Sequence, residues 1–281
     1  MVPRPRQLIL RLLLGAHGKP LAAREAVRAC ALFGIPASGV RVALARLSAA
    51  GLVEPVERGA YRLGRKASTL AADVAAWREA GARTREWSGE WIAVHVGALG
   101  RSDRVALRAR DRALGLLGLR ELDRGLHVRP DNLAGGVAAA RRRLTRLGLE
   151  SDAAVFRAGD FDAGRERRAR SLWDGKALAR GYRNTGARLE RWLANARRLD
   201  PEAAARESFL LGDEAIRQLV FDPLLPVPLV DEQARSAFVE AVIRFDAAGQ
   251  AIWKDFLNDT PAAHRRPVPR AAARTAPEAH R

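Results

Sequence analysis

The sequence predicts an α+β protein with three unlike parts, and three observations support this class. Apolar residues recur at helical spacing through the first 50 residues, and two short alternating strands follow them. Short strands and helices then alternate between residues 87 and 160. From residue 172 onward the apolar pattern is helical. A chain of 281 residues is long enough for two or three domains.

Positive charge is concentrated at the N-terminal end. The whole chain has 49 Lys and Arg against 32 Asp and Glu, a net charge of +17. Residues 1–66 contain twelve of these cations and only three of the acids. A GC-rich genome would explain a preference for Arg over Lys, but it would not keep acids out of this region. The local excess therefore suits a polyanionic partner such as DNA.

The first 66 residues are typical of a winged helix-turn-helix domain. Apolar spacing predicts helices over residues 7–16, 23–33 and 38–50, with Ser38 as the N-cap of the third helix and Gly51 as its stop. Strands are expected over 52–54 and 60–63, joined by Arg58-Gly59. Three helices followed by a hairpin form a device that holds the third helix in the major groove.

The third helix supplies the residues expected to contact DNA. Its apolar side, with Val40, Leu44 and Leu47, should face the core. Of the outward residues, an arginine suits a guanine edge and a valine can meet a thymine methyl, whereas later cations meet phosphate. An ordinary amphipathic helix with solvated arginines is the alternative. The expected DNA-binding residues are Ser38, Arg41, Val42, Ala45 and Arg46 on the helix, and Arg58 and Arg62 on the wing.

The rest of the chain divides into a mixed part and a helical part. A linker helix is expected over 67–86, followed by a strand, helix, strand, strand, helix, strand order over 87–160, which is the ferredoxin-like layout. A helical domain over 161–258 contains helices near 176–198, 201–220 and 231–257. Residues 259–281 are predicted to be a disordered basic tail. The run Arg141-Arg142-Arg143 is either a solvated helix face or a contact to DNA or an anionic effector.

Several classes of function have no support in the sequence. Cys30 is the single cysteine and is expected to be a buried apolar residue, and the histidines lack metal-ligand spacing. No phosphate-binding loop or nucleophile motif occurs, so no enzyme activity and no cofactor are predicted. Asp103 could bind a metal, but it is equally an N-cap. Without an apolar run of about 18 residues or a secretory signal, a cytoplasmic protein with no membrane partner is expected.

Three separated segments together resemble one family. They are LILRLLLG with VRVALARLSAAGLVE, then WSGEWIAV followed by LGLRELDRGLHVRPDNL, and finally SLWDGKALARGYR with LVFDPLLP. Their order and spacing, over residues 5 to about 257, are similar to those of the PaaX-type repressors of phenylacetate degradation genes. The resemblance implies a winged-helix domain, a ferredoxin-like domain similar to the Cas2 nucleases, and a helical C-terminal domain.

The resemblance also implies partners and a mode of regulation. A homodimer would bind a double-stranded DNA operator and leave it when an acyl-CoA thioester, typically phenylacetyl-CoA, binds. Trp173, Arg180 and Arg183 are the effector-binding residues that it suggests. Val96-Gly97 stands where Cas2-like strands end in Tyr-Asp, and the missing carboxylate argues against nuclease activity.

The leading hypothesis is therefore a dimeric transcriptional regulator, most simply a repressor of a catabolic operon. The alternative is a Cas2-like, metal-dependent nuclease fused to a DNA-binding module, in which Asp103 would bind the metal. A third possibility is a constitutive architectural protein that uses the basic tail at residues 259–281.

Overall fold

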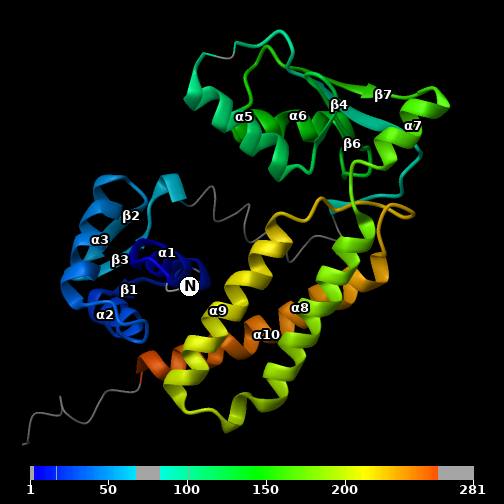
Figure 1. Ribbon diagram of the computed structural model, residues 1–281. Helices are drawn as coiled ribbons and strands as arrows, with labels where there is room; N and C mark the ends of the chain where they lie inside the picture. Colours follow the sequence, from blue (N-terminus) through cyan, green and yellow to red (C-terminus); the bar gives the residue numbers. More distant parts are fainter. Residues whose placement is uncertain (1–2, 17, 68–82, 101, 259–281) are drawn as a thin grey trace, which may run out of the picture.

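The computed structural model describes residues 3–16, 18–67, 83–100 and 102–258, and it shows an α+β protein (Figure 1). The predicted fold class is thereby confirmed at the level of mixed helices and small antiparallel sheets. Residues 68–82 of the expected linker helix and the whole of the expected tail, 259–281, lie outside the described residues.

The N-terminal segment consists of three helices and a small sheet. Its elements are α1 (Pro5–Gly15), β1 (Leu21–Ala22), α2 (Ala23–Ala31), α3 (Ala37–Ala49), β2 (Val53–Glu57) and β3 (Ala60–Leu63). The antiparallel sheet has the order β1-β3-β2. The sequence did not predict β1, because two residues are too few to show alternation. The apolar sides of the three helices meet in one core, in which Cys30 is fully buried, as predicted. Burial raises the pKa of the Cys30 thiol to about 11.

The middle segment has the predicted order of strands and helices. Its elements are β4 (Trp91–His95), α5 (Arg104–Leu116), β5 (Arg120–Asp123), β6 (Leu126–Pro130), α6 (Gly136–Arg146) and β7 (Ala154–Ala158). All neighbouring strands are antiparallel, in the order β5-β6-β4-β7. The first and third strands of the segment are therefore central, and the second and fourth are at the edges.

The two faces of this sheet belong to different cores. Ile92 and Val94 of β4 face α5 and α6 and pack with Leu114 and Leu144. The alternate residues of the same strand, Trp91 and Ala93, face the C-terminal helices, because successive side chains of a strand point to opposite faces. The sheet thus lies between the two cationic helices α5 and α6 on one face and the C-terminal helices on the other.

The C-terminal segment is helical. It contains α7 (Ala163–Arg170), α8 (Gly175–Asn195), the short 3-10 helix η3 (Ala196–Arg198), α9 (Pro201–Val220) and α10 (Glu232–Asn258). Asp162, Asp174 and Asp200 cap α7, α8 and α9 by accepting hydrogen bonds from amides of the first turn. The helix α10 runs across both α8 and α9 and packs against each, and the chain passes from α9 to α10 through an extended connection (Figure 1).

A buried arginine joins the middle segment to that connection. Arg129 of β6 donates to the carbonyls of Leu117 and Pro130 and, over 2.8 Å, to the Oδ1 atom of Asn132. Asn132 in turn donates to the carbonyl of Leu224 over 2.7 Å. Burial lowers the pKa of Arg129 to about 9, although its hydrogen bonds satisfy the guanidinium. The two segments are therefore held together by a polar network as well as by apolar packing.

Candidate functional site

The helix expected to contact DNA, α3, begins two residues earlier than its sequence signal suggests. Pro36 is the N-cap of α3, in an extended conformation, and no side chain accepts a capping hydrogen bond there. The prediction that Ser38 is the N-cap is therefore wrong: the fixed φ of Pro36 starts the helix first, and Ser38 lies exposed in the first turn. At the other end, Gly51 has a φ of +68° and stops the helix, as predicted.

The two sides of α3 have opposite characters. Val40, Leu44 and Leu47 are between 0% and 3% exposed and pack in the core with α1 and α2. Burying three such side chains stabilises the helix by roughly 1.5–3 kcal/mol each. The other side is exposed to solvent and carries the residues predicted to face DNA: Ser38, Arg41, Val42, Ala45 and Arg46.

The cations of α3 have no ion-pair partner among the residues that the structure describes. Among the described residues, no acidic group forms an ion pair with Arg41 or Arg46. Val42, between them on the outer surface, is 50% exposed. Two uncompensated guanidinium groups beside an exposed apolar side chain are suited to a surface that offers both phosphate and apolar contacts.

The hairpin of β2 and β3 places its two arginines differently. Arg58 lies exposed at the turn, next to Gly59, whose φ of +81° permits the tight reversal. Arg62 lies opposite Glu54 in the strand register, and its Nε atom donates to Glu54 Oε1 over 2.6 Å. The cation of Arg62 is therefore already paired within the hairpin, whereas Arg58 has no ion pair in the described part of the chain.

The N-terminal segment packs on the helices α9 and α10. Arg11 forms an ion pair with Asp213, and the rings of Phe33 and Phe209 meet edge to face at 5.4 Å. The guanidinium of Arg28 lies 4.5 Å from the centroid of the Phe256 ring. Cation–π and aromatic contacts of this kind contribute about 0.5–1.5 kcal/mol each. Sequence reasoning did not find this interface, because its two sides are about 200 residues apart in the chain.

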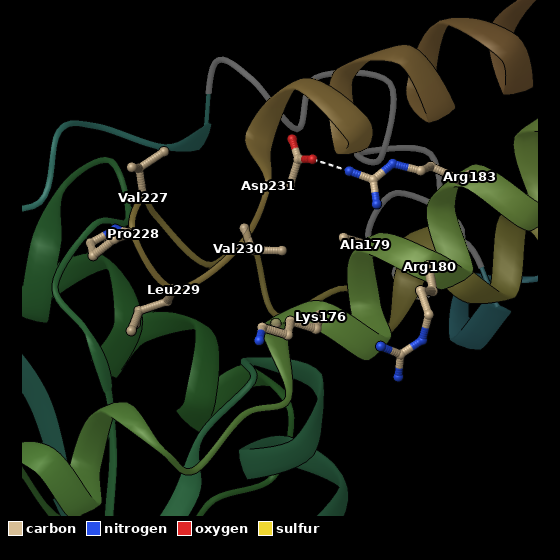
Figure 2. A pocket seen from close by; sticks show the side chains of 10 residues that line it. Lys176, Ala179, Arg180, Arg183, Val227, Pro228, Leu229, Val230 and Asp231 are labelled. Carbon is tan, nitrogen blue, oxygen red and sulfur yellow. Dashed lines mark hydrogen bonds and ion pairs between the residues drawn. The ribbon is translucent and has the colours of Figure 1, made fainter.

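A second candidate site is a groove between the start of α8 and the connection that leads from α9 to α10 (Figure 2). It has a volume of about 560 Å³. Lys176, Arg180 and Arg183 approach it from α8, and Arg183 forms an ion pair with Asp231, as the dashed line in Figure 2 marks. The opposite wall is the apolar run of residues 227–230, from the connection between α9 and α10. The groove therefore combines three cations with an apolar wall.

Trp173, by contrast, does not line this groove. It is 8% exposed, stacks on Trp91 at 6.1 Å and donates from its Nε1 atom to the carbonyl of Gly118 over 3.2 Å. The structure thus brings two of the three expected effector residues together and places the third in the core, just before α8. Lys176 and Asp231 also line the groove and were missed, since only the fold brings residues 175–183 and 227–231 together.

Two models of one protein family match the parts of the chain that contain these two sites. A family model described as "PaaX-like protein" matches residues 4–67, and one described as "PaaX-like protein C-terminal domain" matches residues 173–255. The chain belongs to the PaaX-type family. As a PaaX-type protein it is a transcriptional regulator, not a member of an enzyme family. The N-terminal match contains α3 and the hairpin, and the C-terminal match contains the whole groove.

A solved structure has a similar fold. The chain is 26% identical to the uncharacterized protein Rv0674 from Mycobacterium tuberculosis, with a TM-score of 0.60. The likeness covers 89% of this PaaX-type chain and 97% of the other, so it also includes the middle segment between the two family matches. No curated protein matches the chain.

Asp103, the carboxylate that could bind a metal, has a structural role in this PaaX-type protein. The carboxylate of Asp103 accepts hydrogen bonds from the amides of Val105 and Ala106, at 2.7 and 3.2 Å, so it serves as the N-cap of α5. Over the described ranges, no three His, Cys, Asp or Glu side chains gather as metal ligands. In the same ranges, no helix is both long and apolar enough to cross a membrane.

Proposed function

We propose that this protein is a dimeric repressor of a phenylacetate-type catabolic operon, released from its DNA operator by an acyl-CoA thioester. The observation that carries the proposal is the exposed, unpaired cationic side of α3 in a chain of the PaaX-type family. Residues 1–66 would be the winged-helix DNA-binding domain, 87–160 a ferredoxin-like, Cas2-like domain, 161–258 the helical domain and 259–281 a basic tail. Residues 67–86 would be the linker, and the expectation that it is helical throughout is wrong at its end, because Thr84 pairs with Leu133 in a β-bridge and residues 85–86 are not helical. Two half-sites one helical turn apart, or a multiple of it, suit such a dimer.

In the proposed DNA complex, different exposed residues of α3 would contact bases and phosphates. Arg41 is proposed to bind a guanine edge, and Val42 to contact a thymine methyl group. Ser38, Ala45 and Arg46 would lie along the groove wall, with Arg46 on phosphate. On the wing, Arg58 and Arg62 are proposed to hold phosphate or the minor groove.

On the effector side, the groove has the chemistry that an acyl-CoA thioester requires. The phosphates of the acyl-CoA would bind Lys176 and Arg180. Arg183 would also bind them once its ion pair with Asp231 breaks. The apolar wall at residues 227–230 would take the acyl or pantetheine portion. Trp173 would act indirectly, since it is buried and fixes the start of α8.

The test of the DNA-binding proposal is the substitution Arg41→Ala. Loss of a bidentate base contact should cost roughly 1–3 kcal/mol on operator DNA and relax one base preference, while binding to random DNA changes little. The measurement is the affinity for a selected operator and for a random duplex at one salt concentration. Equal losses on both would show that Arg41 is a phosphate contact and would overturn the assignment.

The test of the effector proposal adds phenylacetyl-CoA to the operator complex. The thioester should release the DNA, whereas free coenzyme A and phenylacetate at the same concentration should not. Release by none of the three would refute the acyl-CoA part of the proposal and leave the DNA-binding part standing.

A further inference from the structure

The helices α5 and α6 of the middle segment concentrate arginine. Together they contain eight arginines and a single acidic residue, Asp111. Both helices cover the same face of the sheet, and their apolar residues pack against β4 in one core. Their other sides therefore face away from the sheet, toward the solvent (Figure 1).

The arginines of α5 form a row on the outer side. Arg104, Arg108 and Arg112 are exposed and follow one another at intervals of four residues, so they project from one side of the helix. The buried residues of α5, which include Ala113 and Leu114, lie on the opposite side. A rise of 1.5 Å per residue separates successive arginines of the row by about 6 Å.

The helix α6 repeats the pattern. Arg142 and Arg146 are exposed, again four residues apart, while Ala140 and Leu144 face the sheet. Arg141 is engaged, because its Nη2 atom donates to the carbonyl of Val155 over 2.5 Å. The outer sides of the two helices thus form one surface, here called the α5–α6 arginine face: Arg104, Arg108, Arg112, Arg142 and Arg146.

This charge is not compensated within the described part of the chain. None of the five arginines forms an ion pair there, whereas Arg110, on the inner side of α5, pairs with Glu150. Of the nearby carboxylates, Asp103 is occupied as the helix cap and Asp111 lies beside the row. Five unpaired cations held on two rigid helices favour a polyanionic partner.

We propose that the α5–α6 arginine face binds the phosphate backbone of the DNA duplex that α3 reads, as a second and sequence-independent contact. This inference rests on the proposed function. Successive phosphates of one DNA strand advance by about 3.4 Å along the helix axis and also wind around it, so neighbouring phosphates lie farther apart in space than this rise. A row of arginines at intervals of about 6 Å can therefore follow the phosphates of one strand.

Other polyanions fit the face less well. Neither helix contains an aromatic residue on which the bases of a single strand could stack. A lipid surface would require an apolar stripe beside the cations, but the large exposed apolar residue of the two helices is Val105 alone. Duplex DNA requires only cations at a suitable spacing.

The experiment measures the salt dependence of DNA binding by the full-length protein. The variant is Arg104→Gln, Arg108→Gln and Arg112→Gln together. Since each phosphate contact contributes about 0.9 to the slope of log affinity against log salt, the slope should fall by about 2 to 3. The affinities for operator and random duplex should fall by the same factor, because phosphate contacts carry no sequence information.

The matched control removes the same charge elsewhere. Arg191→Gln, Arg197→Gln and Arg198→Gln alter exposed arginines of α8 and η3 that form no ion pair in the described part of the chain, and this triple variant should keep the slope of the unmodified protein. The pair Arg142→Gln and Arg146→Gln is an independent variant on α6, expected to lower the slope by about 1 to 2. Unchanged circular dichroism melting curves would verify that each variant is folded.

Each outcome decides the inference. A slope that is unchanged in both arginine-face variants, or that falls equally in the control, overturns it. If the unmodified protein prefers no operator but the arginine-face variants still lower the slope on random duplex, the proposed function fails while this inference holds. If operator recognition is intact and the slopes do not move, the inference fails alone.

Discussion

Arg183 forms an ion pair with Asp231, and the carboxylate of Asp231 also caps the helix α10. One oxygen, Oδ2, faces the guanidinium in the groove, whereas Oδ1 accepts a hydrogen bond of 2.9 Å from the amide of Ala234. A single side chain therefore takes part both in the groove and in the start of a 27-residue helix.

The far end of the same helix touches the N-terminal segment, which is proposed to bind DNA. At 1.5 Å per residue, α10 is about 40 Å long. Near its C-terminal end, Phe256 is buried beneath Arg28 of α2. A ligand that draws Arg183 away from Asp231 thus acts on one end of a rigid element whose other end holds the N-terminal segment. This arrangement supplies a physical path by which the proposed effector would alter the grip on DNA.

The first prediction concerns Asp231→Asn. An asparagine still caps α10 but no longer attracts Arg183, so an anionic ligand would compete with a neutral side chain. We expect phenylacetyl-CoA to bind roughly 3- to 10-fold more tightly, about 1 kcal/mol, as measured by titration calorimetry.

The control for this prediction is Arg188→Gln, which removes an ion pair with Glu214 between α8 and α9. It should leave the affinity for phenylacetyl-CoA unchanged. Weaker binding by the Asp231→Asn protein would mean that the carboxylate helps to hold the ligand, contrary to the proposed role.

The second prediction concerns the interface of the N-terminal segment. Phe209→Ala removes the ring that meets Phe33 and lies 6.0 Å from the guanidinium of Arg11. Because Phe209 is only partly buried, the free energy of unfolding should fall by about 1–2 kcal/mol, less than for a core phenylalanine. Amide exchange should quicken in α1 and α2, and the effector should release DNA less completely. The variant Phe221→Ala, at an exposed ring at the end of α9, should change neither property.

The third prediction distinguishes the structural role of Asp103 from a catalytic one. Asp103→Ala should lower the free energy of unfolding by about 1 kcal/mol through loss of the α5 cap, and Asp103→Asn should retain most of it. Chemical denaturation measures both effects. Incubation of intact duplex with Mg²⁺ or Mn²⁺ should leave the DNA uncut by all three proteins. Metal-dependent cutting that disappears in Asp103→Ala would instead support a nuclease.

The fourth prediction concerns pH and His127 of β6. Burial lowers the pKa of His127 below its ordinary value of 6.5, with Glu121 opposing the change. The folded state therefore disfavours the charged imidazole, so the stability is present above about pH 6.5 and is lost as the pH falls through the folded-state pKa. His127→Gln should flatten the pH dependence of the free energy of unfolding below that pH. Chemical denaturation at several pH values above and below 6.5 measures the effect, and an unchanged pH dependence in this variant would contradict the role given to His127.

Much of the fold follows from local patterns. The three-residue and four-residue spacing of Val40, Leu44 and Leu47 predicts the buried side of α3, and these residues are buried. The turn at Asp123 to Gly125 likewise marks the hairpin of β5 and β6 within one or two residues. Local apolar spacing predicts these elements because each helix or strand must bury one apolar side in a core. This requirement does not depend on how distant parts of the chain are arranged.

The rest depends on contacts between distant residues. The groove joins α8 to a connection 50 residues later, and Arg11 reaches Asp213 only because the N-terminal segment packs on α9. Competition between local signals also misleads: Ser38 is a good capping residue, but Pro36 fixes the backbone first. The sequence around Trp173 does not show whether its ring lies in the core or contacts a ligand.

The pairing of Arg62 with Glu54 has a consequence for how the proposed repressor searches a chromosome. If the hairpin binds DNA as proposed, Arg62 exchanges Glu54 for phosphate, and the free-energy cost of this exchange is the same at every sequence. The affinities for the operator and for random sites therefore fall by the same factor. Occupancy of an operator among a large excess of random sites depends on the ratio of the two affinities, and this ratio does not change. The ion pair thus weakens every encounter along a chromosome without altering the competition between the operator and the random sites.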